Sequence, residues 1–216
     1  MGDPDMNLVD DLRRLSVESS GERLARQLGF IVGIEKMKSV LRRTLLADSS
    51  RRENDAEHSW HLAIAALLLS EHAGAAAPAV DILKVLKMAL VHDLVEIYAG
   101  DTFAYDAAGN ADKAARERES ADRLFTRLPA DQCAEIRALW EEFDAESTPE
   151  AKYAASLDRF MPLLNNFLSC GYAWKSGDVN SEAVFKRMDI IRTGFPVLWP
   201  VVVGIINLSI EKGYLK

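Results

Sequence analysis

The period of the apolar residues constrains the fold of this chain more than any other feature of the sequence. Nearly every patterned segment repeats its apolar side chains with the period of about 3.6 residues that is typical of an α-helix. The alternation of a half-buried strand is not seen, and no strand–helix–strand rhythm indicates a parallel sheet. The sequence therefore predicts an all-α fold, arranged as a single compact bundle of about seven to nine helices.

Start and stop signals divide the chain into predicted helices. Asn54 and Glu57 have the spacing of a capping box, and Pro149 after Thr148 marks the first turn of a later helix. Two glycines and several short polar residues between positions 98 and 110 predict a loop or flap beside a functional site. The helices are predicted at residues 22–46, 54–71, 79–97, 111–128, 130–145, 181–192 and 196–210. One more begins at Thr148 and Pro149, carries Asp158 and is expected to bend near Pro162.

The sequence contains no internal repeat and no linker long enough to divide it into parts. Residues 1–20 are polar and are expected to form a flexible N-terminal segment. The chain has 216 residues, of which 49% are hydrophobic, and this is enough to bury one substantial core. Residues 21–216 are therefore expected to form a single helical domain.

The charge of the chain limits the kind of partner that it can bind. The formal net charge is −7, whereas general binding of nucleic acid requires a basic surface. A nucleic-acid polymer is therefore not an expected partner. A small anionic substrate remains compatible with this composition, because a local group of arginines can hold one phosphate.

The expected location is the cytoplasm. Cys133 and Cys170 lie far apart and lack the spacing of a disulfide framework, which fits a reducing compartment. The N-terminal residues show no apolar signal-peptide core. Residues 195–210 are strongly apolar but shorter than the roughly 20 residues of a membrane span, and they contain Pro200 and Gly204. This segment is predicted to be a buried helix, and no membrane association is expected.

Histidine and aspartate residues from three predicted helices form a candidate metal site. The candidates are His58, the adjacent pair His92 and Asp93, and Asp158. Helical bundles build such sites from side chains that converge from facing helices. Asp158 lies among apolar neighbours, where a carboxylate is costly unless it is paired or binds a metal. Imidazole and carboxylate together suit a divalent transition metal such as Mn, Co, Zn, Fe or Ni.

Simpler interpretations exist for each of these residues alone. A histidine beside an aspartate on a helix is more often a hydrogen-bonded pair than a pair of metal ligands. His58 can be a surface residue near a helix start, and His61, one turn later, competes with it as a ligand. Taken together, the four candidates favour a metal site. The nucleophile elbow, the phosphate-binding loop and the dinucleotide fingerprint are all missing from the sequence.

The motifs around these residues resemble those of a known superfamily. His58 in AEHSWH, His92 and Asp93 in HDLVEIYAGD, and the distant Asp158 are similar to the metal-binding signature of the HD-domain phosphohydrolases. The longer stretches RTLLADSSRRENDAEHSWHLA and HDLVEIYAGD resemble the branch that contains the 5′-deoxynucleotidases. The resemblance covers roughly residues 30–170 and implies an HD-type helical bundle.

The resemblance also implies a reaction and a role for each residue. A divalent metal held by the four candidate ligands would activate a water that hydrolyses nucleoside or deoxynucleoside 5′-monophosphates to nucleoside and phosphate. Glu96 matches a residue implicated in proton handling. Asp101 matches an acid that positions the water or protonates the leaving alkoxide, and Arg43, on the predicted first helix, matches an arginine that faces the substrate phosphate. Each residue also has a simpler interpretation. Glu96 can orient a ligand histidine, Asp101 can be a turn residue, and Arg43 can lie on a solvated helix face.

One departure from the family pattern leaves the substrate open. Part of this branch follows the phosphate-side arginine with Thr-Gly-Trp, whereas here Thr44 precedes two leucines. The nearest tryptophan is Trp60, on the next predicted helix, so an aromatic contact to base or sugar is not assigned. Rival interpretations are a cyclic-nucleotide or other phosphodiesterase, a triphosphohydrolase, and a non-catalytic nucleotide-sensing module. A homodimer formed through the apolar C-terminal helix and the segment around Trp174 is the alternative to burying these residues in the core.

Overall fold

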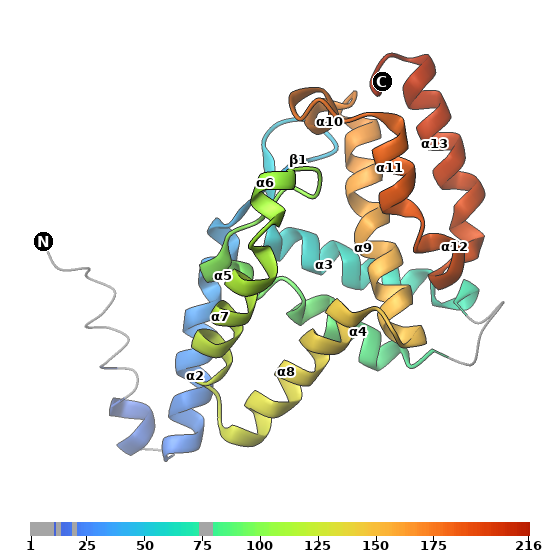
Figure 1. Ribbon diagram of the computed structural model, residues 1–216. Helices are drawn as coiled ribbons and strands as arrows, with labels where there is room; N and C mark the ends of the chain where they lie inside the picture. Colours follow the sequence, from blue (N-terminus) through green and yellow to red (C-terminus); the bar gives the residue numbers. More distant parts are fainter. Residues whose placement is uncertain (1–10, 12–13, 19–20, 74–79) are drawn as a thin grey trace, which may run out of the picture.

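The computed structural model describes residues 11, 14–18, 21–73 and 80–216, and it is almost entirely helical (Figure 1). The prediction of an all-α bundle is therefore confirmed, apart from one small hairpin. Most of the predicted N-terminal segment, residues 1–20, lies outside the described residues, although residues 14–18 are helical. No described helix is long and apolar enough to cross a membrane.

The described part of the chain contains eight longer helices, and shorter helical turns connect them. The longer helices are α2 (Glu22–Ile34), α3 (Asp55–Leu68), α4 (Ile82–Val91), α7 (Lys113–Phe125), α8 (Ala130–Ala145), α9 (Pro149–Leu168), α11 (Ser181–Met188) and α13 (Trp199–Glu211). The shorter turns are η1 (Glu35–Ser39), η2 (Ser70–His72), α5 (Glu96–Ala99), α6 (Ala107–Asn110), α10 (Tyr172–Ser176), α12 (Ile191–Gly194) and η3 (Pro196–Leu198).

The predicted helix over residues 22–46 is wrong in its second half. After α2 and η1 the chain forms strand β1 (Leu41–Leu45), which pairs antiparallel with β2 (Arg52–Asn54). The side chain of Arg52 strengthens this hairpin by donating to the main-chain carbonyls of Leu41 and Arg42. Leucine and arginine are good helix formers, so pairing with the backbone of β2 overrides the local preference for a helix here.

The predicted helix over residues 79–97 is also interrupted. Helix α4 begins after its capping residue Asp81 and ends at Val91, and α5 starts only at Glu96. Between them the chain makes tight turns, in which the amide of Glu96 donates to the carbonyl of Asp93 at 2.9 Å. His92 and Glu96 therefore do not lie on one continuous helix face.

Two helix starts that matter for the site follow their predicted signals. The amide of Glu57 donates to the Asn54 side chain at 3.0 Å, and the Glu57 carboxylate accepts from the Asn54 amide at 3.2 Å. This capping box begins α3. The amide of Ala151 donates to the hydroxyl of Thr148 at 3.2 Å and begins α9. Both helices carry candidate metal ligands.

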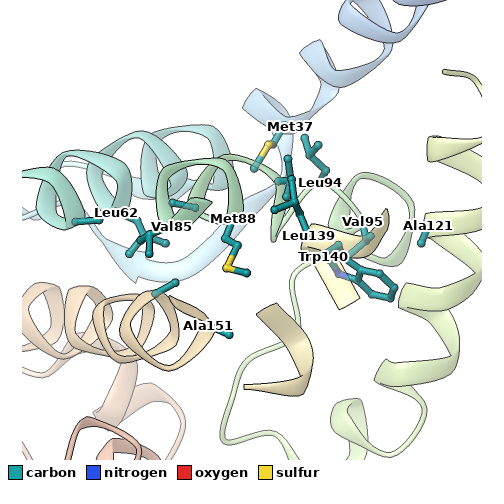
Figure 2. Packing of buried hydrophobic residues seen from close by; sticks show 14 of the residues in the cluster. Met37, Leu62, Val85, Met88, Leu94, Val95, Ala121, Leu139, Trp140 and Ala151 are labelled. Atoms are coloured by element: carbon teal, nitrogen blue, oxygen red, sulfur yellow. The ribbon is translucent and has the colours of Figure 1, made fainter. Parts of the chain in front are cut away.

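Two hydrophobic clusters hold the helices together. The larger one lies between α3, α4, α8 and α9, and Figure 2 shows Leu62, Val85 and Met88 packed there with Ala151. The smaller one lies between α9, α11 and α13 and contains Trp174, which is 1% exposed. Trp174 therefore belongs to the core, and its burial removes it from the predicted dimer interface.

Leu62 offers a direct test of the larger cluster, since its side chain is fully buried at the centre of α3. Replacement by alanine is expected to lower the free energy of unfolding by about 2–5 kcal/mol, because a leucine-sized cavity cannot fully collapse. The matched control is Leu67→Ala on the same helix, where the side chain is 51% exposed and the expected loss is within about 0.5 kcal/mol. Urea unfolding measures both; equal losses would contradict the packing.

Candidate metal centre

The three helices α3, α4 and α9 bring the four predicted ligand residues together. His58 lies one turn into α3, His92 and Asp93 directly follow α4, and Asp158 lies in the middle of α9. These helices pack against one another in the centre of the molecule (Figure 1). All four side chains are buried or nearly so, as the helical-bundle argument predicts.

The donor atoms of these residues lie within a few ångströms of one another. The Nε2 atom of His58 is 2.8 Å from Oδ1 of Asp158 and 4.0 Å from Oδ2 of Asp93. The Nε2 atom of His92 is 3.1 Å from Oδ2 of Asp93 and 3.6 Å from Oδ1 of Asp158. Two imidazole nitrogens and two carboxylate oxygens therefore face one small volume.

The orientation of His92 fits a metal ligand. Its Nδ1 donates to the main-chain carbonyl of Ala89 at 3.0 Å, which directs Nε2 toward the carboxylates. Nε2 is buried and has no hydrogen-bond partner of its own. Burial lowers the pKa of His92, but Asp93 and Asp158 outweigh it and raise the pKa to about 10. The carboxylates therefore favour a positive charge at this point, and a divalent cation supplies one while satisfying the unpaired nitrogen.

A second group of carboxylates lies beside the first. Oxygen atoms of Asp55, Glu96 and Asp101 approach one another within 4.8 Å. Burial, reinforced by the neighbouring negative charges, raises the pKa of Asp55 to about 7 and that of Glu96 well above its ordinary value. Burial also raises the pKa of Asp101. Buried oxygens of Asp55 and Glu96 lack hydrogen-bond partners, so this group can hold protons or an oxygen-ligated cation.

Arg42 joins the two groups of acids. Its Nη1 atom lies 2.8 Å from Oδ2 of Asp93 and 3.5 Å from Oδ1 of Asp55, and its Nε atom lies 3.6 Å from Oε2 of Glu53. The guanidinium is largely buried, so these ion pairs are not screened by water. Arg42 therefore acts as a fixed counter-charge that holds Asp55 and Asp93 in place.

The strand geometry separates Arg42 from Arg43. Successive side chains of a strand point to opposite sides, and on β1 the Arg42 side chain is 12% exposed, whereas Arg43 is exposed. The guanidinium of Arg43 lies 4.9 Å from the centre of the Phe103 ring, at the mouth of the cleft. Arg43 therefore lies at the site as predicted, but on a strand and not on a helix.

Sequence reasoning missed Arg42 and Asp55 as parts of this site. Asp55 lies three residues before His58, and helical spacing puts the two on one face, so the signal was present. Arg42 can be recognised as part of the site only once strand β1 is known, because the strand turns its side chain toward the acids.

Two further residues considered from the sequence lie elsewhere. Trp60 is 63% exposed, and its ring stacks on that of His61 at 6.0 Å. Neither residue lines the cleft beside the candidate ligands.

Two of the four candidate ligands, Asp93 and Asp158, line the inner of two neighbouring chambers. The inner chamber has a volume of about 90 Å³ and is lined by Asp93, Glu96, Asp101 and Asp158 together with aromatic residues of the flap. The outer chamber has a volume of about 570 Å³ and shares the residues Ala104, Tyr105, Arg159 and Arg187 with the inner one. The two chambers therefore adjoin along these four residues.

Comparisons with known proteins agree with this geometry. A family model described as HD domain matches residues 34–199. Curated relatives named 5′-deoxynucleotidase HDDC2 are 30% identical over 142 residues in Bos taurus and 28% identical over 145 residues in Homo sapiens. These matches cover 65% and 67% of this chain, and 66% and 68% of the relatives, so the similarity spans about two thirds of their length.

Solved structures show the same fold. A predicted metal-dependent phosphohydrolase from Magnetospirillum magnetotacticum MS-1 is 49% identical, with a TM-score of 0.83, over 89% of this chain and 95% of that one. The protein PH0347 from Pyrococcus horikoshii OT3 is 23% identical, with a TM-score of 0.59, over 84% of this chain and 99% of that one, and shares the fold alone.

Proposed function

The chain belongs to the HD domain family, and from this premise we propose that it is a metal-dependent phosphohydrolase that acts on deoxynucleoside 5′-monophosphates. The observation that carries the proposal is the convergence of donor atoms of His58, His92, Asp93 and Asp158, of which Asp93 and Asp158 line the inner chamber. The names of the curated relatives and of the Magnetospirillum structure support the reaction class. The four residues would hold one divalent cation, and its identity among Mn, Co, Zn, Fe and Ni is left open by this donor set.

The neighbouring acids supply the proton transfers that the reaction needs. A bound divalent cation contributes Lewis acidity and lowers the pKa of a water in its coordination sphere. Burial and adjacent carboxylates raise the pKa of Glu96 well above its ordinary value, and we assign it the role of a general acid or base. Asp101, at the start of the flap, also has a raised pKa. In this proposal a water oxygen forms a bond to phosphorus, and Asp101 gives a proton to the 5′ oxygen as the bond from phosphorus to that oxygen breaks and the nucleoside leaves.

The sizes of the two chambers support a monophosphate as substrate. Pockets that enclose a drug-sized ligand have volumes of roughly 300–1,000 Å³. The inner chamber, at about 90 Å³, is far below this range and suits the phosphoryl group, whereas the outer chamber, at about 570 Å³, can take the nucleoside. Arg43 at the mouth of the inner chamber is the predicted phosphate contact, while Arg42 is already engaged by carboxylates.

Two further assignments are kept as parts of this proposal. The two cysteines, Cys133 and Cys170, are both free, which supports a reducing compartment such as the cytoplasm. A homodimer is also retained, with exposed apolar residues of α13 such as Val201 and Leu208 available to form it. Size-exclusion chromatography with light scattering measures the oligomeric state.

Phosphate release from a nucleotide panel tests the proposed function. The metal-depleted protein, supplied with Mn²⁺, Co²⁺ or Zn²⁺, is expected to release phosphate from dAMP or dUMP, and EDTA is expected to abolish the release. Cyclic nucleotides and deoxynucleoside triphosphates serve as alternative substrates, and turnover confined to either would favour the rival hydrolases. Tight nucleotide binding without turnover of any compound would favour a sensing module instead.

A further inference from the structure

Arg187 lies where the two chambers of the cleft meet. It is the next-to-last residue of α11, which packs alongside α9 (Figure 1), and its side chain lines both chambers. The side chain is partly buried and forms no hydrogen bond or ion pair within the described part of the chain. Burial lowers the pKa of Arg187, the Asp158 carboxylate opposes this shift, and the charge of Arg159 adds to it.

A partly buried guanidinium without an ion partner is costly, because water no longer solvates its charge. The positive charge of Arg187 is therefore not balanced by an ion pair within the described part of the chain. Asp158 does not meet this need, since its Oδ1 atom is 2.8 Å from His58 in the candidate metal site. A ligand that brings its own negative charge into the cleft would satisfy Arg187.

The other cations around the cleft differ from Arg187 in this respect. Arg42 pairs with Asp93 and Asp55, Arg159 pairs with Glu146, and Lys113 pairs with Glu117 at 3.3 Å. Arg43 has no carboxylate partner, but it is exposed and lies against the Phe103 ring. Among the described residues that line the inner chamber, Arg187 is thus a partly buried cation without an ion pair and is available to a ligand.

The charge of the expected substrate requires such a residue. A phosphate monoester carries up to two negative charges, and the two positive charges of a divalent cation are already matched by Asp93 and Asp158. The carboxylates of Glu96 and Asp101 line the same inner chamber. Uncommitted cations must therefore offset the phosphate, and guanidinium groups suit phosphate because they can donate two parallel hydrogen bonds.

We propose that Arg187 binds the phosphate of the substrate from α11, as a second guanidinium in addition to Arg43. This inference rests on the proposed function, since it takes a phosphate ester as the ligand. Arg187 at the boundary of the chambers holds the phosphate in the inner one and directs the nucleoside into the outer one. The inner part of the cleft is therefore completed by a residue from the C-terminal region, outside the stretch that carries the metal motifs.

Binding of inorganic phosphate to the Mn²⁺-loaded full-length protein, measured by calorimetry, tests this assignment. Arg187→Gln is expected to raise the Kd of phosphate by about 10- to 100-fold, the effect of losing one charge-assisted hydrogen bond. Arg187→Lys keeps the positive charge without the planar guanidinium. Its Kd of phosphate is therefore expected to lie between that of the unaltered protein and that of Arg187→Gln. The matched control is Lys212→Gln, which removes an exposed cation that lines neither chamber. Its Kd is expected to stay close to that of the unaltered protein.

Metal content and thermal melting of each variant show whether the fold and the metal site are intact. Arg187→Gln with full metal content and an unchanged Kd for phosphate would overturn the assignment and leave the proposed function standing. Loss of metal from Arg187→Gln would assign the residue to the metal site and would also overturn it. If the unaltered loaded protein binds no phosphate and hydrolyses no nucleotide, the proposed function itself fails.

Discussion

Replacing His92 by alanine is expected to leave the purified protein without its divalent metal and without hydrolytic activity. The Nε2 atom of His92 is buried without a hydrogen-bond partner among the described residues, and it faces carboxylate oxygens of Asp93 and Asp158. Removing it leaves those two acids close together without a cation to balance them. The direct measurement is metal content by mass spectrometry after loading with Mn²⁺ and removal of free ions.

The controls separate loss of the ligand from loss of the fold. His61→Ala removes the second histidine of α3, which stacks on Trp60 away from the site, and is expected to keep its metal. The ring of His92 also packs 4.7 Å from that of Phe143, so alanine leaves a gap. Asp93→Asn keeps the volume and should lose the metal as well. Full occupancy in both His92→Ala and Asp93→Asn would refute the ligand assignment.

Replacing Glu96 by glutamine is expected to lower kcat by about 10²- to 10⁴-fold while the metal stays bound, the usual contribution of a general acid or base. Glutamine preserves the shape of the side chain but cannot exchange a proton. Glu96 is 4% exposed and belongs to the carboxylate group with Asp55 and Asp101, apart from the four candidate ligands. Steady-state kinetics on a deoxynucleoside monophosphate, together with metal analysis, measures both quantities.

Glu117→Gln is the matched control, because Glu117 is also buried but pairs with Lys113 outside the carboxylate group. Its kcat is expected to stay close to that of the unaltered protein. A near-normal kcat for Glu96→Gln would mean that Glu96 only supports the structure. Loss of metal in that variant would move Glu96 into the metal site.

The candidate ligands were predictable because their chemistry stands out against apolar helices. A carboxylate such as Asp158 amid buried apolar residues needs a partner, and the position of a residue on a helix follows from its number. The structure brings this residue to His58 across a hundred positions of sequence. The long helices of the bundle were predictable for the same reason of periodicity, and the family model agrees with the fold.

The parts that sequence reasoning did not reach depend on contacts between distant segments. Strand β1 forms because its backbone pairs with β2, and residues 41–45 taken alone favour a helix. The inward position of Arg42 follows from that pairing, so its ion pair with Asp93 could not be predicted from spacing. The position of Arg187, which has no ion pair among the described residues, likewise depends on how α11 packs against α9. No local sequence pattern encodes this packing.

The distribution of the four candidate ligands over α3, α4 and α9 has a consequence for the whole molecule. A cation bound by them would be a non-covalent cross-link between three segments that are distant in the chain. An ion that binds only the folded chain stabilises it in proportion to the logarithm of its free concentration, by about 2.7 kcal/mol at a hundred times its Kd. The availability of metal would then govern how long the protein survives as well as how fast it works.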